Sequence, residues 1–177
     1  MWYDEYITDF KATMFMVGVD VDDVQFTGFW SQGDGASFTF DARDVVNKQF
    51  LTYLIESEYW KGEGSSIDPR EFTARYNLHK VLPMDEEMEK LLELLFENLL
   101  ISSERSTSRY SHEMTCSMNI DSEEHEDLTD ELLDGIQAAA EKWRIDECHR
   151  LYNILEEGYS ASGQADLDEA FEEEDEI

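Results

Sequence analysis

Acidic residues outnumber basic residues by more than three to one in this chain. Its 177 residues include 43 Asp and Glu against 13 Lys and Arg, which gives a net charge of −30. A surface of this sign repels phosphate groups and anionic lipid headgroups. The charge therefore excludes a conventional nucleic-acid-binding protein and a membrane-surface protein, and it favours a partner with a basic surface.

The rest of the composition is that of a folded protein. Hydrophobic residues make up 41% of the chain and aromatic residues 12%, so it can bury a sizeable core. The longest apolar run, Met14–Val19, is too short to cross a bilayer, and no signal-peptide pattern opens the chain. Cys116 and Cys148 form neither a disulfide framework nor a CxxC pair. We expect a reduced, soluble, cytoplasmic protein.

The charge is unevenly distributed along the chain. Residues 1–60 carry a net charge of −8 and residues 61–120 a net charge of −4, whereas residues 121–177 carry −18. A solubilising coat would be more even, so the asymmetry favours a charged face. We expect one domain over residues 1–160, followed by an acidic C-terminal segment over residues 161–177.

The first half of the chain shows clear hydrophobic periodicity. It predicts a helix over residues 2–17 and a helix from a cap at Asp44 to about Tyr59. Between them, residues 24–31 and 36–41 are predicted to form a β-hairpin around the turn signal Gly33-Asp34-Gly35, with the aromatic residues packed. Residues 62–66 are predicted to form a loop, and residues 67–82 to contain one short helix.

The second half predicts two strands between helices. Pro83 and the acids after it begin a helix to about Leu99, and residues 101–107 and 110–120 are predicted strands. A long helix over 129–159, broken near residues 144–146, precedes a shorter helix near 167–173. The simplest arrangement is an α+β fold, in which two β-hairpins form a four-stranded antiparallel sheet packed with several helices and followed by acidic C-terminal helices and a tail.

Catalytic and metal-binding patterns are weak. The segment His112–Cys116 begins like the zinc motif HExxH but ends in Cys, and it falls in a predicted strand, where residues four apart lie about 13 Å apart. Asp20–Asp23 lacks the Gly and distal Glu of a calcium loop, and Gly33–Gly35 lacks the Lys of a phosphate loop. We expect no catalytic residue, no metal and no cofactor, and therefore no enzyme.

The density of negative charge is comparable with that of DNA. Thirty charges equal those of about 15 base pairs, a rod roughly 50 Å long, and a compact domain of this size is about 40 Å across. Like charges three or four residues apart weaken a helix, so a structural role alone does not explain rows of them. Such rows, and neighbouring acids, predict phosphate-mimicking side chains that bind a partner: Asp127, Asp130, Glu131, Asp134, Glu86, Glu89, Glu93, Glu97, Glu156 and Glu157.

Three motifs carry a resemblance to a known family. They are GFWSQGDGASF at residues 28–38, RYxHxM at 109–114 and LYxxLExxY at 151–159. With them the chain resembles an uncharacterised family of small phage- and plasmid-borne proteins, sometimes labelled antitoxin-like. The resemblance implies a phage or plasmid origin, and it implies that Trp30, Phe38 and the glycines are the scaffold of a hairpin. By its charge, the chain also resembles phage DNA-mimic proteins.

Charge and resemblance together favour a phage-encoded DNA mimic. Such a protein would inhibit a basic DNA-binding host protein (a restriction enzyme, CRISPR effector, gyrase, nucleoid protein or repair protein) by occupying its DNA-binding channel in the host cytoplasm. We expect no direct binding to nucleic acid or membrane, and we expect a homodimer that lengthens the charged face. The alternatives are an antitoxin-like protein that masks a basic partner, a generic acidic domain of solubilising or halophilic kind, and a small carboxylate enzyme.

Overall fold

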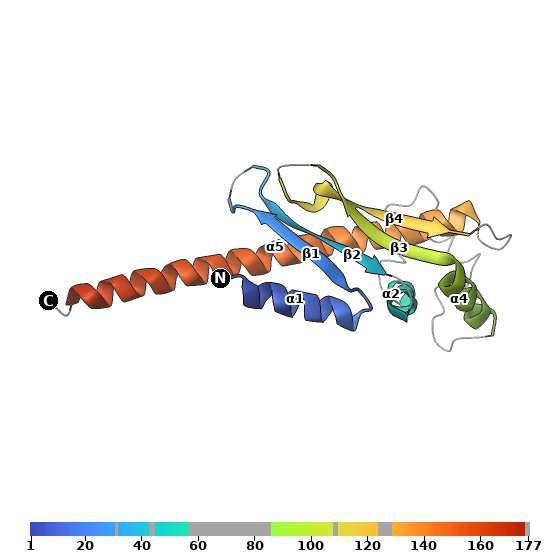
Figure 1. Cartoon of the computed structure of the whole chain (residues 1–177), viewed down its shortest axis with the longest axis horizontal. Coiled ribbons are helices and arrows are strands. Elements are labelled where there is room, and N and C mark those ends of the chain that lie inside the picture. The colour runs from blue at the N-terminus through green and yellow to red at the C-terminus, as the bar shows by residue number, and fades with distance from the viewer. Residues whose placement is uncertain (31, 43–44, 57–85, 108–109, 124–128, 176–177) are drawn as a thin grey trace.

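The chain folds as an α+β protein (Figure 1). The computed structural model describes residues 1–30, 32–42, 45–56, 86–107, 110–123 and 129–175. The cap at Asp44, the loop at 62–66, the helix within 67–82 and Pro83 lie outside these residues. The elements are α1 (Asp4–Met16), β1 (Val21–Thr27), β2 (Gly35–Ala42), α2 (Val45–Glu56), α4 (Glu86–Asn98), β3 (Leu99–Arg105), the 3-10 helix η2 (Glu113–Thr115), β4 (Cys116–Ser122) and α5 (Asp130–Asp175).

The predicted N-terminal hairpin is confirmed. β1 and β2 pair antiparallel from Val21–Phe40 to Thr27–Gly35. The connection between them spans seven residues, longer than the predicted tight turn, and Gly28 and Gly33 adopt φ angles of 38° and 92° within it. Glycine carries these positive φ values without the steric cost that a Cβ would bring.

The predicted four-stranded sheet is wrong. The strands form two two-stranded antiparallel sheets, because β1 pairs along β2 and β3 pairs along β4, from Leu99–Ser122 to Arg105–Cys116. β2 and β3 meet only at the end of β2, through the pairs Asp41–Ser102 and Ala42–Ile101. Order along the chain does not reveal this, since both arrangements are built from the same two hairpins.

Beyond the two backbone pairs at Asp41 and Ala42, polar side chains connect β2 and β3. The Phe40 N–H donates to Ser103 Oγ at 2.9 Å, and the Arg105 guanidinium donates to the Ser37 carbonyl at 3.3 Å. Arg105 also forms an ion pair with Asp23 on β1. The backbone groups of β2 that a continuous sheet would pair are therefore partly satisfied by polar side chains of β3.

The C-terminal region is one helix of 46 residues, where two helices and an internal break were predicted. The predicted break near residues 144–146 is therefore wrong. In the structure, Arg144 is buried with 1% of its area exposed. Its guanidinium donates to both Glu141 carboxylate oxygens (3.1 and 2.6 Å) and to the Glu113 backbone carbonyl (2.7 Å). A buried charge held in this way anchors the helix instead of ending it.

The core lies where α5 packs on β2 and β4. Trp143 is at its centre, with its ring 4.7 Å from that of Phe50 and 5.8 Å from that of Phe38. The buried positions of α5 recur every three or four residues, which is the period of a helix with one apolar face: Leu132, Ile136, Ala139, Ala140, Trp143, Cys148, Leu151 and Leu155. Beyond them the backbone of α5 continues past the end of α1 towards the C-terminus (Figure 1).

The predicted strand over 110–120 begins only at Cys116. His112 instead caps η2, with its Nδ1 accepting from the Met114 N–H at 3.1 Å. Gly35 allows residues 111–112 to pass close to the backbone of β2, since a Cβ on Gly35 would lie 2.8 Å from the Cα of His112. The 111–112 segment therefore crosses the start of β2 instead of extending β4.

The anchoring role of Arg144 predicts a large loss of stability on its removal. Arg144→Met removes the ion pair with Glu141 and the hydrogen bond to the Glu113 carbonyl, and we expect the free energy of unfolding to fall by about 3 kcal/mol. The matched control is Lys142→Met on the same helix, which is exposed and should change stability by less than about 0.5 kcal/mol. Urea unfolding followed by circular dichroism measures both; equal effects would contradict the anchor.

The lowered pKa of Glu113 predicts that its contribution to the free energy of unfolding depends on pH. Burial opposes ionisation of Glu113, but hydrogen bonds from its own backbone and from His149 outweigh it and lower the pKa. A carboxyl whose pKa is lowered by folding stabilises the fold above its ordinary pKa, 4.5 here, and loses this effect as the pH falls through the lowered value. Glu113→Gln should therefore be less stable than the native protein at pH 7, and the difference should shrink towards about pH 3. Glu97→Gln, an exposed control, should show no such convergence.

Candidate functional site

The ten predicted carboxylates lie in three places and do not form one patch. Asp130 and Asp134 are exposed near the start of α5, and Glu93 and Glu97 are exposed on α4. Glu156 is half-buried and Glu157 exposed further along α5, about 33 Å from Asp134 at 1.5 Å per residue. Asp127, and the side chains of Glu131 and Glu89, lie outside the described part; Glu86 is exposed at the start of α4.

Two of these acids have a structural role in the first turn of a helix. Thr129 caps α5, since its Oγ1 accepts from the Leu132 N–H at 3.3 Å, which makes Asp130 the first helical residue. Glu86 is likewise the first residue of α4, and it pairs with Lys90 at 3.1 Å. Negative charge at a helix N-terminus interacts favourably with the helix dipole. The expected cost of like charges is therefore offset at these two positions.

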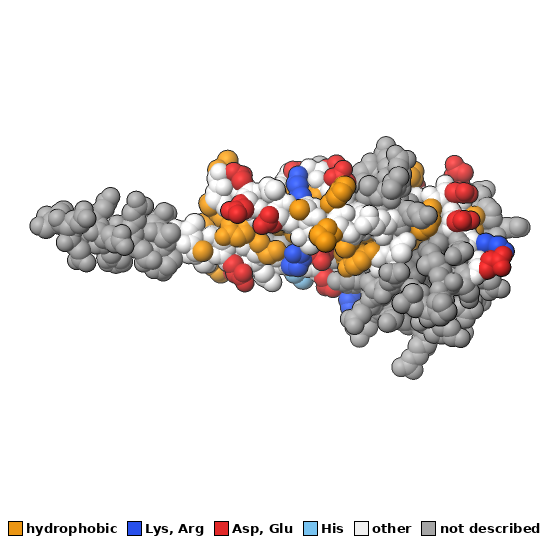
Figure 2. All heavy atoms as spheres, turned by 90° about the horizontal axis from the view of Figure 1, so that it is seen from below, with side chains coloured by type: hydrophobic (Ala, Val, Ile, Leu, Met, Phe, Trp, Pro, Cys, Tyr) orange, Lys and Arg blue, Asp and Glu red, His pale blue; other side chains and the backbone are white. Residues whose placement is uncertain are grey.

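The remaining acids share the surface with apolar side chains. In Figure 2, which shows the face seen from below in Figure 1, acidic groups alternate with hydrophobic ones. Exposed hydrophobic side chains include Phe15, Met16 and Trp30. The described surface is thus acidic and apolar together, which differs from a purely solubilising coat.

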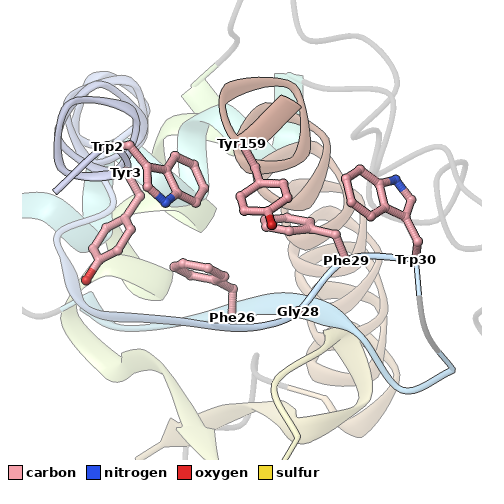
Figure 3. A pocket seen from close by; sticks show the side chains of 7 residues that line it. All are labelled: Trp2, Tyr3, Phe26, Gly28, Phe29, Trp30 and Tyr159. Carbon is pink, nitrogen blue, oxygen red and sulfur yellow. The ribbon is translucent and has the colours of Figure 1, made fainter. Parts of the chain in front are cut away.

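An aromatic pocket lies among the described residues. Its volume is about 410 Å³. Figure 3 shows Trp2 and Tyr3 at one side, Phe26 below, Phe29 and Tyr159 opposite, and Trp30 at the edge. The pocket is lined by Trp2, Tyr3, Phe26, Gly28, Phe29, Trp30 and Tyr159.

Three separate segments position these rings. The residues just before α1 supply Trp2 and Tyr3, the hairpin supplies Phe26 and residues 28–30, and α5 supplies Tyr159. Gly158 lets the two helices approach, because a Cβ there would lie 2.6 Å from the Tyr6 ring. The pocket therefore exists only in the folded chain.

The ring geometry leaves aromatic faces open. The rings of Phe29 and Tyr159 stack with centroids 5.1 Å apart and an interplanar angle of 27°. Trp2 lies 5.6 Å from Tyr159 and 6.2 Å from Phe29 in tilted arrangements. Trp30 remains 67% exposed and Tyr159 43% exposed, so the pocket opens to solvent.

Trp30 is held in a strained backbone conformation. Its φ of 69° is unusual for a residue with a Cβ, and such a conformation costs about 1–3 kcal/mol. The Trp30 N–H donates to the Tyr152 hydroxyl at 3.3 Å, and the Trp30 ring lies 5.6 Å from that of Tyr159. A strained, exposed tryptophan is the kind of residue that marks a binding site.

The resemblance implied that Trp30 and Phe38 belong to the scaffold of the hairpin, and the aromatic residues of the hairpin were predicted to be packed. Phe38 and Phe40 are buried as predicted, whereas Trp30 is 67% exposed. The available signal was position, since Phe29 and Trp30 belong to the connection between strands and not to an alternating strand. Large apolar residues in a surface connection are a hint of binding.

Other chemistry is limited in the described part of the chain. Burial raises the pKa of the Cys148 thiol to about 12, so this cysteine stays protonated at neutral pH. No group of three or more His, Cys, Asp or Glu side chains among these residues could hold a metal ion. In the same residues, no helix combines the length and apolarity needed to cross a bilayer.

A family model described as "Domain of unknown function (DUF8835)" matches residues 2–163. Neither the curated proteins nor the solved structures contain a match. The matched range spans the hairpin, both pairs of strands and the part of α5 that carries Tyr159.

The position of Asp130 in the first turn of α5 predicts that neutralising Asp130 and neutralising Asp134 change the stability of the protein differently. Asp130→Asn removes a charge from the first turn and should lower stability by about 0.3–1 kcal/mol at low salt. Asp134→Asn, beyond the first turn, makes the same charge change and should leave stability unchanged or slightly higher. Thermal unfolding of both variants tests the dipole role, which fails if Asp134→Asn is the more destabilising.

Proposed function

The chain belongs to the DUF8835 family, a domain of unknown function, and from its own surface we propose that it is a phage-encoded DNA mimic. It inhibits a basic DNA-binding host protein by occupying the DNA-binding channel. The phage origin in this proposal rests on the resemblance of the hairpin motif at residues 28–38. Cytoplasmic location and homodimerisation belong to the same proposal.

The observation that carries the proposal is the long acidic helix. α5 holds 15 acidic and three basic residues, and at 1.5 Å per residue its 46 residues extend about 69 Å. The net charge of α5 is therefore −12, or one charge per about 5.8 Å of helix, against one per about 1.7 Å of duplex DNA. A duplex of about 20 base pairs has the same length, so the sign of the charge and the reach of the helix both suit a DNA channel.

The described arginines form ion pairs with carboxylates of the chain itself. All three arginines among the described residues pair with carboxylates of the chain: Arg105 with Asp23, Arg144 with Glu141 and Arg150 with Glu147. Arg105 and Arg144 also have little exposed side-chain area. These three positive charges are therefore paired within the chain.

The three alternatives make different demands. An antitoxin-like protein would bind a basic partner that does not itself bind DNA. A generic acidic domain would bind no partner at all, and the exposed aromatic side chains are a poor fit to it. An enzyme would need acid–base groups in a cleft, and the aromatic pocket offers rings and one glycine instead.

Competition with DNA tests the proposal. A labelled duplex of about 20 base pairs is bound to purified members of each target class, and the protein is titrated in. We expect displacement from at least one class at a concentration about tenfold below that needed by poly-glutamate of the same net charge, −30. Displacement should weaken steeply with salt, because exposed charges are screened beyond about 8–10 Å. Binding to these targets without displacement of the duplex would contradict occupation of the DNA-binding channel.

Two quadruple variants separate a role of the predicted carboxylates from bulk charge. The first neutralises Glu93, Glu97, Asp134 and Glu157 to the amides, and the second neutralises Glu172, Glu173, Glu174 and Asp175. Both remove four charges, so a role of the predicted carboxylates implies about a tenfold loss of affinity for the first and less for the second. Equal losses would mean that only bulk charge matters, and no loss in either would contradict mimicry.

A further inference from the structure

We infer that the aromatic pocket binds the guanidinium group of an arginine presented by the basic partner. The inference rests on the proposed function, because a protein that binds DNA presents arginines along its channel. The pocket is then a site for a single side chain within a broad electrostatic interface. The pocket would then supply specificity that charge alone cannot give.

The pocket's chemistry favours a cation. Six of its seven lining residues are aromatic, and the electron-rich faces of Trp, Tyr and Phe attract a cation within about 6 Å of the ring centroid. Trp2 and Tyr159 have centroids 5.6 Å apart and an interplanar angle of 60°, so the rings present faces in more than one direction. Its volume of about 410 Å³ lies at the small end of ligand pockets, which range over about 300–1,000 Å³.

Carboxylates at the pocket's edge complement a positive charge. A Cβ on Gly28, which lines the pocket, would lie 2.9 Å from Asp34 Oδ1, so this carboxylate lies directly beside the pocket wall. Glu156 is one helical turn before Tyr159 on α5, and residues three apart on a helix are neighbours. Among the described residues, no lysine or arginine lines the pocket. The net charge of −30 also favours a cation over an anion at this opening.

Arginine suits the pocket better than lysine. Its planar guanidinium stacks on aromatic rings and is more weakly hydrated than an ammonium group, so it loses less on leaving water. The chain already uses this contact internally, since the Arg150 guanidinium carbon lies 5.1 Å from the centroid of the Phe10 ring. The pocket repeats the same chemistry with a vacant ring surface facing solvent.

NMR titration with a small probe tests the pocket without the partner. The probe is N-acetyl-arginine amide, compared with N-acetyl-citrulline amide, its neutral isostere, at constant ionic strength. We expect the indole N–H signals of Trp2 and Trp30 to shift saturably with the arginine probe and not with citrulline. Trp143 is buried, and its signal should stay fixed as an internal reference. Equal shifts with both probes, or none with either, would overturn the inference.

Variants extend the test to the partner. Trp30→Gly removes an exposed ring, and glycine suits the positive φ at this position, so the fold should persist. Affinity for the target protein whose DNA is displaced should fall about tenfold. Phe15→Ala is the matched control, because Phe15 is also exposed but lies outside the pocket. Equal losses in the two variants would contradict a specific pocket.

The outcomes distinguish this inference from the proposed function. If the protein displaces DNA but the arginine probe leaves Trp2 and Trp30 unchanged, the pocket inference is wrong and mimicry stands. If the probe binds but no target releases its DNA, the pocket is a cation site and the proposed function is wrong.

Discussion

The packing of Trp143 against the aromatic residues of β2 and α2 is the interaction on which the rest of the structure depends. Its ring contacts Phe38, Phe40 and Phe50, so one residue of α5 joins a hairpin and a second helix. The guanidinium of the next residue, Arg144, fixes the same helix to the η2 segment. With α5 fixed at residues 143–144, Tyr159 is carried to the hairpin connection, where the pocket forms. The pocket is therefore a consequence of the core.

A chain this acidic has few cations with which to stabilise itself, and their use is revealing. The described arginines are committed to internal contacts, each bringing together segments or neighbouring turns through a carboxylate. Ion pairs with little exposed area are screened less by salt than exposed ones. The fold can therefore resist salt concentrations that would weaken an electrostatic complex. Stability and binding thus depend on different charges.

The sequence predicted the local elements well, because periodicity and turn residues act over short distances. The hairpin and the helices over α1, α4 and most of α5 follow from such patterns. It failed where long-range contacts decide the outcome. Ser103 and Arg105 satisfy the edge of β2 through side chains, which no pattern of strand residues reveals. A break was predicted near Arg144, but the carbonyl that accepts from its guanidinium belongs to Glu113, 31 residues earlier. No local sequence pattern reveals a contact over that distance. The acidic candidates were found by count, but their scatter over α4 and both parts of α5 depends on tertiary structure.

Charge and pocket contribute differently to recognition. Long-range attraction between an acidic body and a basic channel mainly raises the rate of encounter and orients the two surfaces. Such attraction does not distinguish one DNA-binding protein from another, since all carry similar charge. Affinity in protein complexes is concentrated in a few desolvated anchors, often aromatic residues or arginine. An aromatic pocket beside carboxylates provides such an anchor on a surface that otherwise acts by charge. Selectivity among basic proteins then depends on which of them presents an arginine where α1, the hairpin and α5 converge.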